Sequence, residues 1–182
     1  SFGAALERRG FIAVARHRSR EIVLYRAGGM NIIVNADPDV AGNSDEGSGA
    51  PRLKAFALRV RDAATAYTHC IDKGAWPITP RVGAMELNIP GVSGVGDTVI
   101  YFVDRYQEFS IYDVDFEWLG EKDPAPKGLG LWYIDHLTHN VQKGRLDEWA
   151  AFYERLFNFR QIRYFDIAGK FTSAGASRAK AD

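Results

Sequence analysis

Two histidines, His136 and His139, are the side chains of this 182-residue chain best suited to bind a metal ion. They lie in residues 134–141, where apolar and β-branched residues alternate with polar ones, a pattern that predicts a β-strand. Successive side chains of a strand point to opposite faces. Since the two histidines are an odd number of positions apart, at most one of them can bind a given metal ion. Two ordinary, half-buried histidines are the alternative interpretation.

The elements that would position these histidines follow from hydrophobic spacing. Residues 143–157 predict an amphipathic helix whose core side carries Trp149, Phe152, Tyr153 and Leu156. A strand is expected at residues 161–167, before a small and polar tail. Residues 6–11 have the same order as the end of that helix: a cationic last turn, a Gly or Asn, and an aromatic residue that enters a strand.

The middle of the chain predicts one complete module, over about residues 53–116. Residues 53–61 should form a strand, and Asp62 should cap a helix that runs to about Lys73 and ends at Gly74. Further strands are expected at 85–89, 98–103 and 109–116, and we expect 53–61 and 109–116 to share one sheet. The expected core residues are Phe56, Leu58, Val60, Tyr67, Leu87, Ile100, Phe102, Ile111 and Phe116.

This order of strand, helix and several strands is used more than once along the chain. It predicts an α+β fold of βαβββ modules, with mostly antiparallel curved sheets and flanking helices. The predicted domains are residues 1–119, whose first module lacks its opening strand, and residues 131–182, the truncated start of a second domain. The Gly- and Pro-rich residues 120–130 form the predicted linker.

Composition excludes several classes of function. The chain carries 23 basic and 23 acidic side chains, so it lacks the positive charge expected of a nucleic-acid-binding protein. No apolar run reaches the ~18 residues of a membrane span, and the first residues do not resemble a signal peptide. The single Cys70 cannot form an internal disulfide, which favours a reducing compartment, the cytoplasm.

Two other motifs could carry chemistry. Residues 91–96 are glycine-rich but do not open a helix, so we expect a hairpin and not a phosphate loop. Asp113, Asp115 and Glu117 alternate on the predicted strand 109–116 and its continuation, and they could bind a cation from one face. A solvated strand face is the favoured alternative for these three acids.

Several strings, in order, resemble bacterial 4-hydroxyphenylpyruvate dioxygenases of the vicinal oxygen chelate (glyoxalase/bleomycin-resistance/dioxygenase) superfamily. They begin with Ala15-Arg16-His17-Arg18-Ser19 and Asn31-Ile32-Ile33-Val34-Asn35 and end with Ile134-Asp135-His136-Leu137-Thr138-His139-Asn140-Val141 and Phe157-Asn158-Phe159. The resemblance runs from about Leu6 to about Thr172. Residues 41–49 depart from it, because the family usually has aromatic and histidine residues in this loop.

The resemblance implies a role for particular residues. His136 would be the first iron ligand of a 2-His-1-carboxylate site, and His139 would not be a ligand. The family's other two ligands lie further along, and no histidine follows Tyr153 in this sequence. Fe(II) is therefore the implied cofactor, which we expect this chain alone to bind weakly or not at all. Ser177, in Ser177-Arg178-Ala179, resembles a substrate-pocket serine, and a disordered polar tail is the alternative.

The implied function is part of a non-haem Fe(II) dioxygenase of tyrosine catabolism. The family converts 4-hydroxyphenylpyruvate and O₂ to homogentisate and CO₂, so the expected partners are an aromatic 2-oxo acid and O₂, without nucleic acid or membrane. A homo-oligomer is compatible with the resemblance. The alternatives are a 4-hydroxymandelate synthase-like enzyme and a non-catalytic vicinal oxygen chelate module that acts by binding or assembly. Bifunctional 3-dehydroshikimate dehydratases also contain a dioxygenase-like half.

Overall fold

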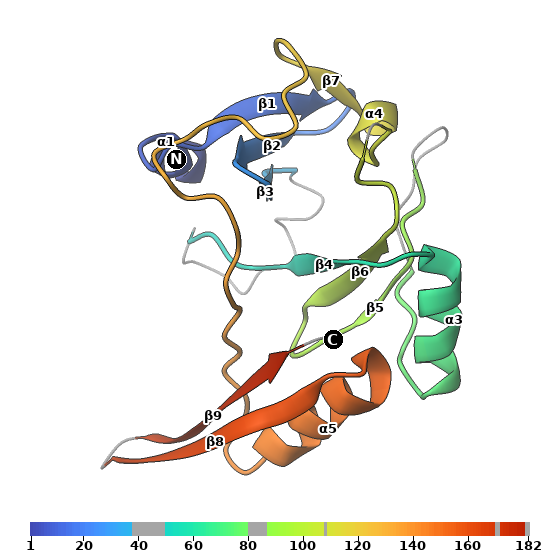
Figure 1. The fold of residues 1–182 in the computed structure, drawn as a ribbon, viewed down its shortest axis with the longest axis vertical. Helices are drawn as coiled ribbons and strands as arrows, with labels where there is room; N and C mark the ends of the chain where they lie inside the picture. The colour runs from blue at the N-terminus through green and yellow to red at the C-terminus, as the bar shows by residue number, and fades with distance from the viewer. Residues whose placement is uncertain (38–49, 80–86, 108, 170–171, 181–182) are drawn as a thin grey trace. The chain divides into compact units, whose positions relative to one another are not determined.

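The computed structural model describes residues 1–37, 50–79, 87–107, 109–169 and 172–180, with side chains up to Arg163. The chain divides into two compact units, each built from separate stretches of sequence. Unit 1 contains Ser1–Arg52, Ala84–Leu87 and Gln107–Leu137, and unit 2 contains Leu53–Gly83, Asn88–Tyr106 and Thr138–Asp182. Figure 1 shows the helices and strands of both units.

Unit 1 is an antiparallel sheet in the order β3-β2-β1-β7. Its strands are β1 (Ile12–His17), β2 (Ile22–Ala27), β3 (Met30–Asn35) and β7 (Phe116–Trp118). Helix α1 (Phe2–Glu7) precedes β1, and the short helix α4 (Tyr112–Asp115) precedes β7. Alternation along the strands gives the sheet two apolar clusters. One cluster is Leu6, Phe11, Tyr25, Ala27 and Met30, and the other is Val14, Ala15, Leu24 and Phe116.

Unit 2 contains a three-stranded sheet in the order β4-β6-β5. Strand β4 (Ala55–Arg59) pairs in parallel with β6 (Val99–Val103), and β5 (Gly91–Ser93) pairs antiparallel with β6. Helix α3 (Ala63–Asp72) and helix α5 (Leu146–Phe157) both contribute to the core of this sheet. The buried members of that core are Ala63, Cys70, Ala75, Val92, Ile100, Phe102 and Leu156.

Helix α3 shows how local signals fix an element. The Asp62 carboxylate accepts a hydrogen bond from Thr65 N at 2.6 Å, and Asp104 accepts one from Ala63 N at 2.9 Å. These acceptors satisfy amides that the first turn of a helix leaves without an intrahelical partner. At the other end the chain turns at Gly74, whose φ of +90° lies in the region that favours glycine.

The C-terminal elements of unit 2 form a helix and a hairpin. Asn158 ends α5 in the left-handed conformation, with φ of +57°. Strand β8 (Arg160–Gly169) then pairs antiparallel with β9 (Thr172–Lys180), and Figure 1 shows them as two long neighbouring arrows. The tail after residue 169 was not expected to form a strand. Its small residues still pair through their backbones with β8.

Most predicted elements are confirmed. The expected strands at 53–61, 98–103 and 161–167 are β4, β6 and β8, and the helix capped by Asp62 is α3. The predicted helix at 143–157 is α5, which begins three residues later. Residues 91–96 open the β5–β6 hairpin, as expected. The α+β class is also confirmed.

The expectation for residues 109–116 is wrong. Residues 112–115 form α4, and Phe116 begins β7, which pairs with β1 and not with the sheet that contains β4. The reason is local, because the Asp113 side chain accepts from Ser110 N at 2.7 Å and the Asp113 amide donates to the Ser110 carbonyl. Such side-chain bonds to the backbone compete with a strand ladder.

The residues of the expected core are therefore divided between the two units. Ile100 and Phe102 are buried in unit 2, with Phe56, Leu58, Val60 and Tyr67 packed against that core. Phe116 is buried in unit 1, and the half-buried Leu87 and Ile111 also belong to unit 1. The predicted strand 85–89 begins outside the described residues, and residues 87–89 are not in a strand.

Packing of α5 on the β4-β6-β5 sheet can be tested at Leu156, which is fully buried. We predict that Leu156→Ala lowers the free energy of unfolding by about 2–5 kcal/mol, because it removes buried methyl groups and leaves a cavity. The neighbouring exposed Arg155 provides the control, and Arg155→Ala should change the stability by less than about 0.5 kcal/mol. Urea unfolding measures both, and equal effects of the two substitutions would contradict this packing.

Candidate functional site

Residues 131–141, which contain the candidate ligand His136, are not a strand, so that prediction is wrong. A strand needs a hydrogen-bonding neighbour, and no described strand pairs with this segment. The His136 side chain is 67% exposed, and its Nδ1 lies 2.7 Å from Asp135 Oδ2. An imidazole beside a carboxylate is a common arrangement for a histidine that binds metal. This pair alone does not provide the arrangement of ligands that a metal site needs.

His139 has different surroundings from His136. Its Nε2 lies 3.1 Å from the Tyr153 hydroxyl, and its ring lies 5.9 Å from the ring of Phe56. Burial lowers the pKa of His139 and raises the pKa of Tyr153 to about 12. Both groups are therefore neutral near pH 7, and the Tyr153 hydroxyl can donate to the unprotonated Nε2. His139 belongs to unit 2, whereas His136 belongs to unit 1.

The described residues do not form an iron site. Among them, no group of three or more His, Cys, Asp or Glu side chains could hold a metal ion. A non-haem Fe(II) site of the 2-His-1-carboxylate type needs three ligands on one face of the metal. The role of His136 as one of these ligands therefore stays a prediction.

Ser177, the predicted pocket residue, lies in β9, where its Cα pairs with that of Tyr164. The position of its side chain is outside the described residues. Its role in binding substrate stays a prediction.

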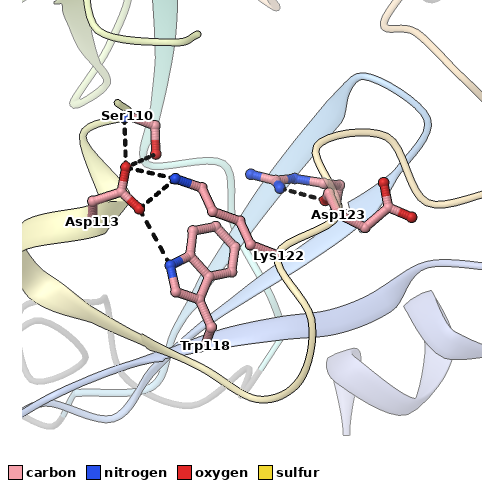
Figure 2. Close-up of polar contacts among 6 residues, drawn as sticks. Ser110, Asp113, Trp118, Lys122 and Asp123 are labelled. Atoms are coloured by element: carbon pink, nitrogen blue, oxygen red, sulfur yellow. Dashed lines mark hydrogen bonds and ion pairs between the residues drawn. The ribbon is translucent and has the colours of Figure 1, made fainter. Parts of the chain in front are cut away.

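The acidic residues considered for a cation site have other partners. Asp113 accepts hydrogen bonds from Ser110 N at 2.7 Å, Lys122 Nζ at 2.7 Å and Trp118 Nε1 at 3.3 Å, as Figure 2 shows. Burial raises the pKa of Asp113, but the hydrogen bonds from Lys122, Ser110 and Trp118 and the charge of Lys122 outweigh it, so the pKa is lowered overall. Lys122 thus occupies the place that a cation would take.

Asp115 and Glu117 are also engaged. The Asp115 carboxylate accepts from Leu87 N at 3.1 Å, and Glu117 forms an ion pair with Arg18 at 3.2 Å. Because residues 112–115 are helical, the three acids do not line one strand face.

Arg26 is a structural residue that sequence reasoning missed. It is 5% exposed on β2. Its Nε donates to Asn31 Oδ1 at 2.7 Å, and its Nη1 donates to the Asp123 carbonyl at 2.8 Å. Burial lowers the pKa of Arg26, against the opposing effect of nearby Tyr112, Asp123 and Asp113. An arginine inside the apolar run of β2 was a signal for such a partner, although it does not identify Asp123.

The ring of Trp118 lies near two cations. Arg26 Cζ and Lys122 Nζ each lie 5.4 Å from its centroid, within the range of cation–π attraction. With the Asp113–Lys122 and Arg26–Asp123 bonds, this arrangement holds residues 118–123 on the unit 1 sheet (Figure 2). We call these contacts of Trp118, Lys122, Asp113, Arg26 and Asp123 the clamp. Its role is structural, because every charged group in it has a partner.

Among the residues that the structure describes, no helix is both long and apolar enough to cross a membrane.

Comparison with known proteins places these elements in context. Residues 1–117 match the family described as "Hydroxyphenylpyruvate dioxygenase, HPPD, N-terminal". The chain is 49% identical over 165 residues to "Hemolysin VllY" of Vibrio vulnificus, and 48% identical over 164 residues to a 4-hydroxyphenylpyruvate dioxygenase of Pseudomonas sp. strain P.J. 874. Each alignment covers 90% of this chain and 46% of the relative, so the chain spans about half the length of these relatives.

A solved structure agrees with this match. It is a fusion protein of a xylose isomerase-like TIM barrel and a 4-hydroxyphenylpyruvate dioxygenase, with a TM-score of 0.76 and 28% identity. The alignment covers 99% of this chain and 28% of the fusion protein. The βαβββ vicinal oxygen chelate type of fold is therefore confirmed.

The clamp can be tested at Asp113. We predict that Asp113→Asn lowers the free energy of unfolding by about 1–3 kcal/mol, because it removes the charge that several donors share. Glu121→Gln removes an exposed carboxylate nearby and should have an effect below about 0.5 kcal/mol. Urea unfolding followed by tryptophan fluorescence gives both values. Equal stability of Asp113→Asn and the wild type would show that the clamp does not stabilise unit 1.

The burial of His139 predicts a dependence of stability on pH. Its folded-state pKa is lowered from 6.5, so its contribution to stability is present above that pH and is lost as the pH falls. Between about pH 7 and about pH 5, we expect the wild type to lose more stability than His139→Gln, which cannot titrate. Urea unfolding at several pH values gives the slope of stability against pH for each of the two proteins. Identical slopes would contradict the burial of a neutral imidazole here.

Proposed function

Since this chain belongs to the hydroxyphenylpyruvate dioxygenase N-terminal family, we propose that it forms part of a non-haem Fe(II) dioxygenase. The proposed reaction converts 4-hydroxyphenylpyruvate and O₂ to homogentisate and CO₂. The proposed setting is tyrosine catabolism in the cytoplasm, and the enzyme could act as a homo-oligomer.

The main support for this proposal is the extent of the sequence similarity. The family match ends at residue 117, but the alignment with the Pseudomonas dioxygenase covers 90% of the chain, at 48% identity. It therefore includes residues beyond the N-terminal family match. The Ile134-Asp135-His136 string lies in this later part of the chain.

Within the proposed enzyme, His136 is a metal ligand and His139 is a structural residue. The exposure of His136 leaves its imidazole available, whereas the His139 ring is held by Tyr153 and Phe56. One imidazole is not sufficient for a selective iron site, because affinity depends on the assembled ligand set. We therefore expect the 182-residue chain alone to bind Fe(II) weakly and to have no turnover.

The division of the chain into domains is also part of the proposal. We propose an N-terminal domain over residues 1–119, a linker over 120–130, and the start of a C-terminal catalytic domain from residue 131. Ser177 is the proposed substrate-pocket residue of that second domain. A non-catalytic binding or assembly module, and a 4-hydroxymandelate synthase-like enzyme, are the alternatives that the experiments below separate from this proposal.

The ligand assignment is tested in the complete reading frame that contains these residues. We predict that His136→Ala lowers the iron content and the consumption of 4-hydroxyphenylpyruvate to background, while the fold is kept. His139→Ala should lower the melting temperature and change the iron content only slightly, because it removes a core contact. Iron analysis, oxygen uptake and thermal unfolding of both variants provide the measurements.

Two results would contradict the proposal. If His136→Ala keeps the iron content and the turnover of the wild type, the ligand assignment is wrong. If the unsubstituted protein neither binds iron nor consumes the 2-oxo acid, the binding or assembly module becomes the better explanation.

A further inference from the structure

The backbone of residues 126–132 is tied to the turn between β2 and β3 within unit 1. Gly28 N donates to the Pro126 carbonyl at 2.9 Å, and Gly29 N donates to the Trp132 carbonyl at 3.1 Å. Two consecutive amides of one turn therefore hold two carbonyls of this segment. The second of these carbonyls belongs to Trp132, four residues before His136.

Glycine is required at the first position of this turn. Gly28 has a φ of +53°, a conformation that residues with a side chain rarely adopt. A methyl group at Gly28 would also lie 2.6 Å from Trp132 Cα and 2.9 Å from the Trp132 carbonyl oxygen. The neighbouring Gly29 differs, because a methyl group there would meet the Trp132 carbonyl oxygen only at 3.8 Å.

A second close approach lies a few residues earlier in the same segment. A methyl group at Gly10, where φ is +86°, would lie 2.6 Å from Leu129 N. A methyl group at Gly128 would lie 2.5 Å from the Gly10 carbonyl oxygen. The segment thus contacts both the turn before β1 and the turn after β2, with backbone against backbone.

Pro126 is buried, but side-chain burial cannot account for the placement of the residues from Leu129 onward. Trp132 is 66% exposed, and the other large apolar residues around it, Leu129, Leu131, Tyr133, Ile134 and Leu137, are exposed as well. Apolar burial stabilises roughly in proportion to the area removed from water, so these side chains contribute little. The backbone hydrogen bonds and the close approach at glycine are the contacts that locate the segment.

We propose that Gly28 is a positioning residue for His136 and acts through the backbone of Trp132. The chain spans at most ~3.6 Å per residue, so an anchor at Trp132 keeps His136, four residues later, within ~14 Å of the anchored carbonyl beside the β2–β3 turn. The meaning of this confinement for catalysis rests on the proposed function. The anchoring itself is a property of the 182-residue chain and can be measured without turnover.

The test compares three alanine variants of this chain. Gly28→Ala introduces both the strain and the clash. Gly96→Ala introduces a side chain at a φ of +61° in unit 2, where a methyl group would have no atom within 4 Å, so it controls for backbone strain. Gly29→Ala changes the adjacent position without a close contact. Thermal unfolding shows which variants fold, and ¹⁵N relaxation gives order parameters for the amides of residues 131–136.

We expect the order parameters of residues 131–136 to fall from ~0.8 to below ~0.6 in Gly28→Ala alone. Unchanged order parameters in Gly28→Ala, or the same fall in Gly96→Ala, would overturn the inference. If Gly28→Ala does not fold, amide hydrogen exchange in the wild type decides. Slow exchange at both Gly28 and Gly29 supports the anchor, and exchange at the rate of an unstructured chain overturns it. Neither result depends on iron or substrate, so failure of the anchor is distinct from failure of the proposed function.

Discussion

The return of residues 116–132 onto the first sheet is the contact on which the structure of unit 1 depends. Strand β7 adds to β1 through pairs such as His17 with Phe116. The chain then stays on the sheet through the Asp113–Lys122 ion pair, the bond from Arg26 to the Asp123 carbonyl, and the amides of Gly28 and Gly29. Apart from the Asp113–Lys122 pair, these contacts join residues that lie far apart in the sequence. Together they convert a Gly- and Pro-rich stretch into an ordered part of the unit.

This arrangement gives the two histidines of the candidate site different supports. His136 follows the anchored segment of unit 1, exposed and beside Asp135. His139 is held in unit 2 by Tyr153 on α5, and Leu156 of the same helix is buried against the β4-β6-β5 sheet. A ligand needs an accessible, unprotonated nitrogen, whereas a structural histidine is best kept neutral by burial. The surroundings of each residue therefore suit the role proposed for it.

Much of the fold could be predicted where local chemistry decides it. Asp62 and Gly74 mark the two ends of α3, and Asn158 marks the end of α5, because caps and left-handed turns depend on residues close in sequence. Residues 109–116 could not be assigned in the same way. Their apolar alternation resembles a strand, but the bonds between Asp113 and Ser110 form a turn, and pairing with β1 takes only the residues from Phe116 onward.

The candidate site was less predictable than the fold. The pattern at residues 134–141 has the alternation of a strand, but a strand also depends on a partner, which periodicity does not reveal. The bond between Arg26 and Asp123 joins positions 97 apart, and no local pattern connects them. The proposed role of His136 as a metal ligand rests on the resemblance of residues 134–141 to a family, since strand parity left the choice between the two histidines open.

The most direct test of the account is the identity of the product formed by the complete reading frame from 4-hydroxyphenylpyruvate and O₂. The account predicts homogentisate, with one CO₂ released and one O₂ consumed for each substrate molecule. Chromatography and mass spectrometry distinguish homogentisate from 4-hydroxymandelate. Formation of 4-hydroxymandelate, or the absence of any product from an iron-loaded and folded protein, would contradict it.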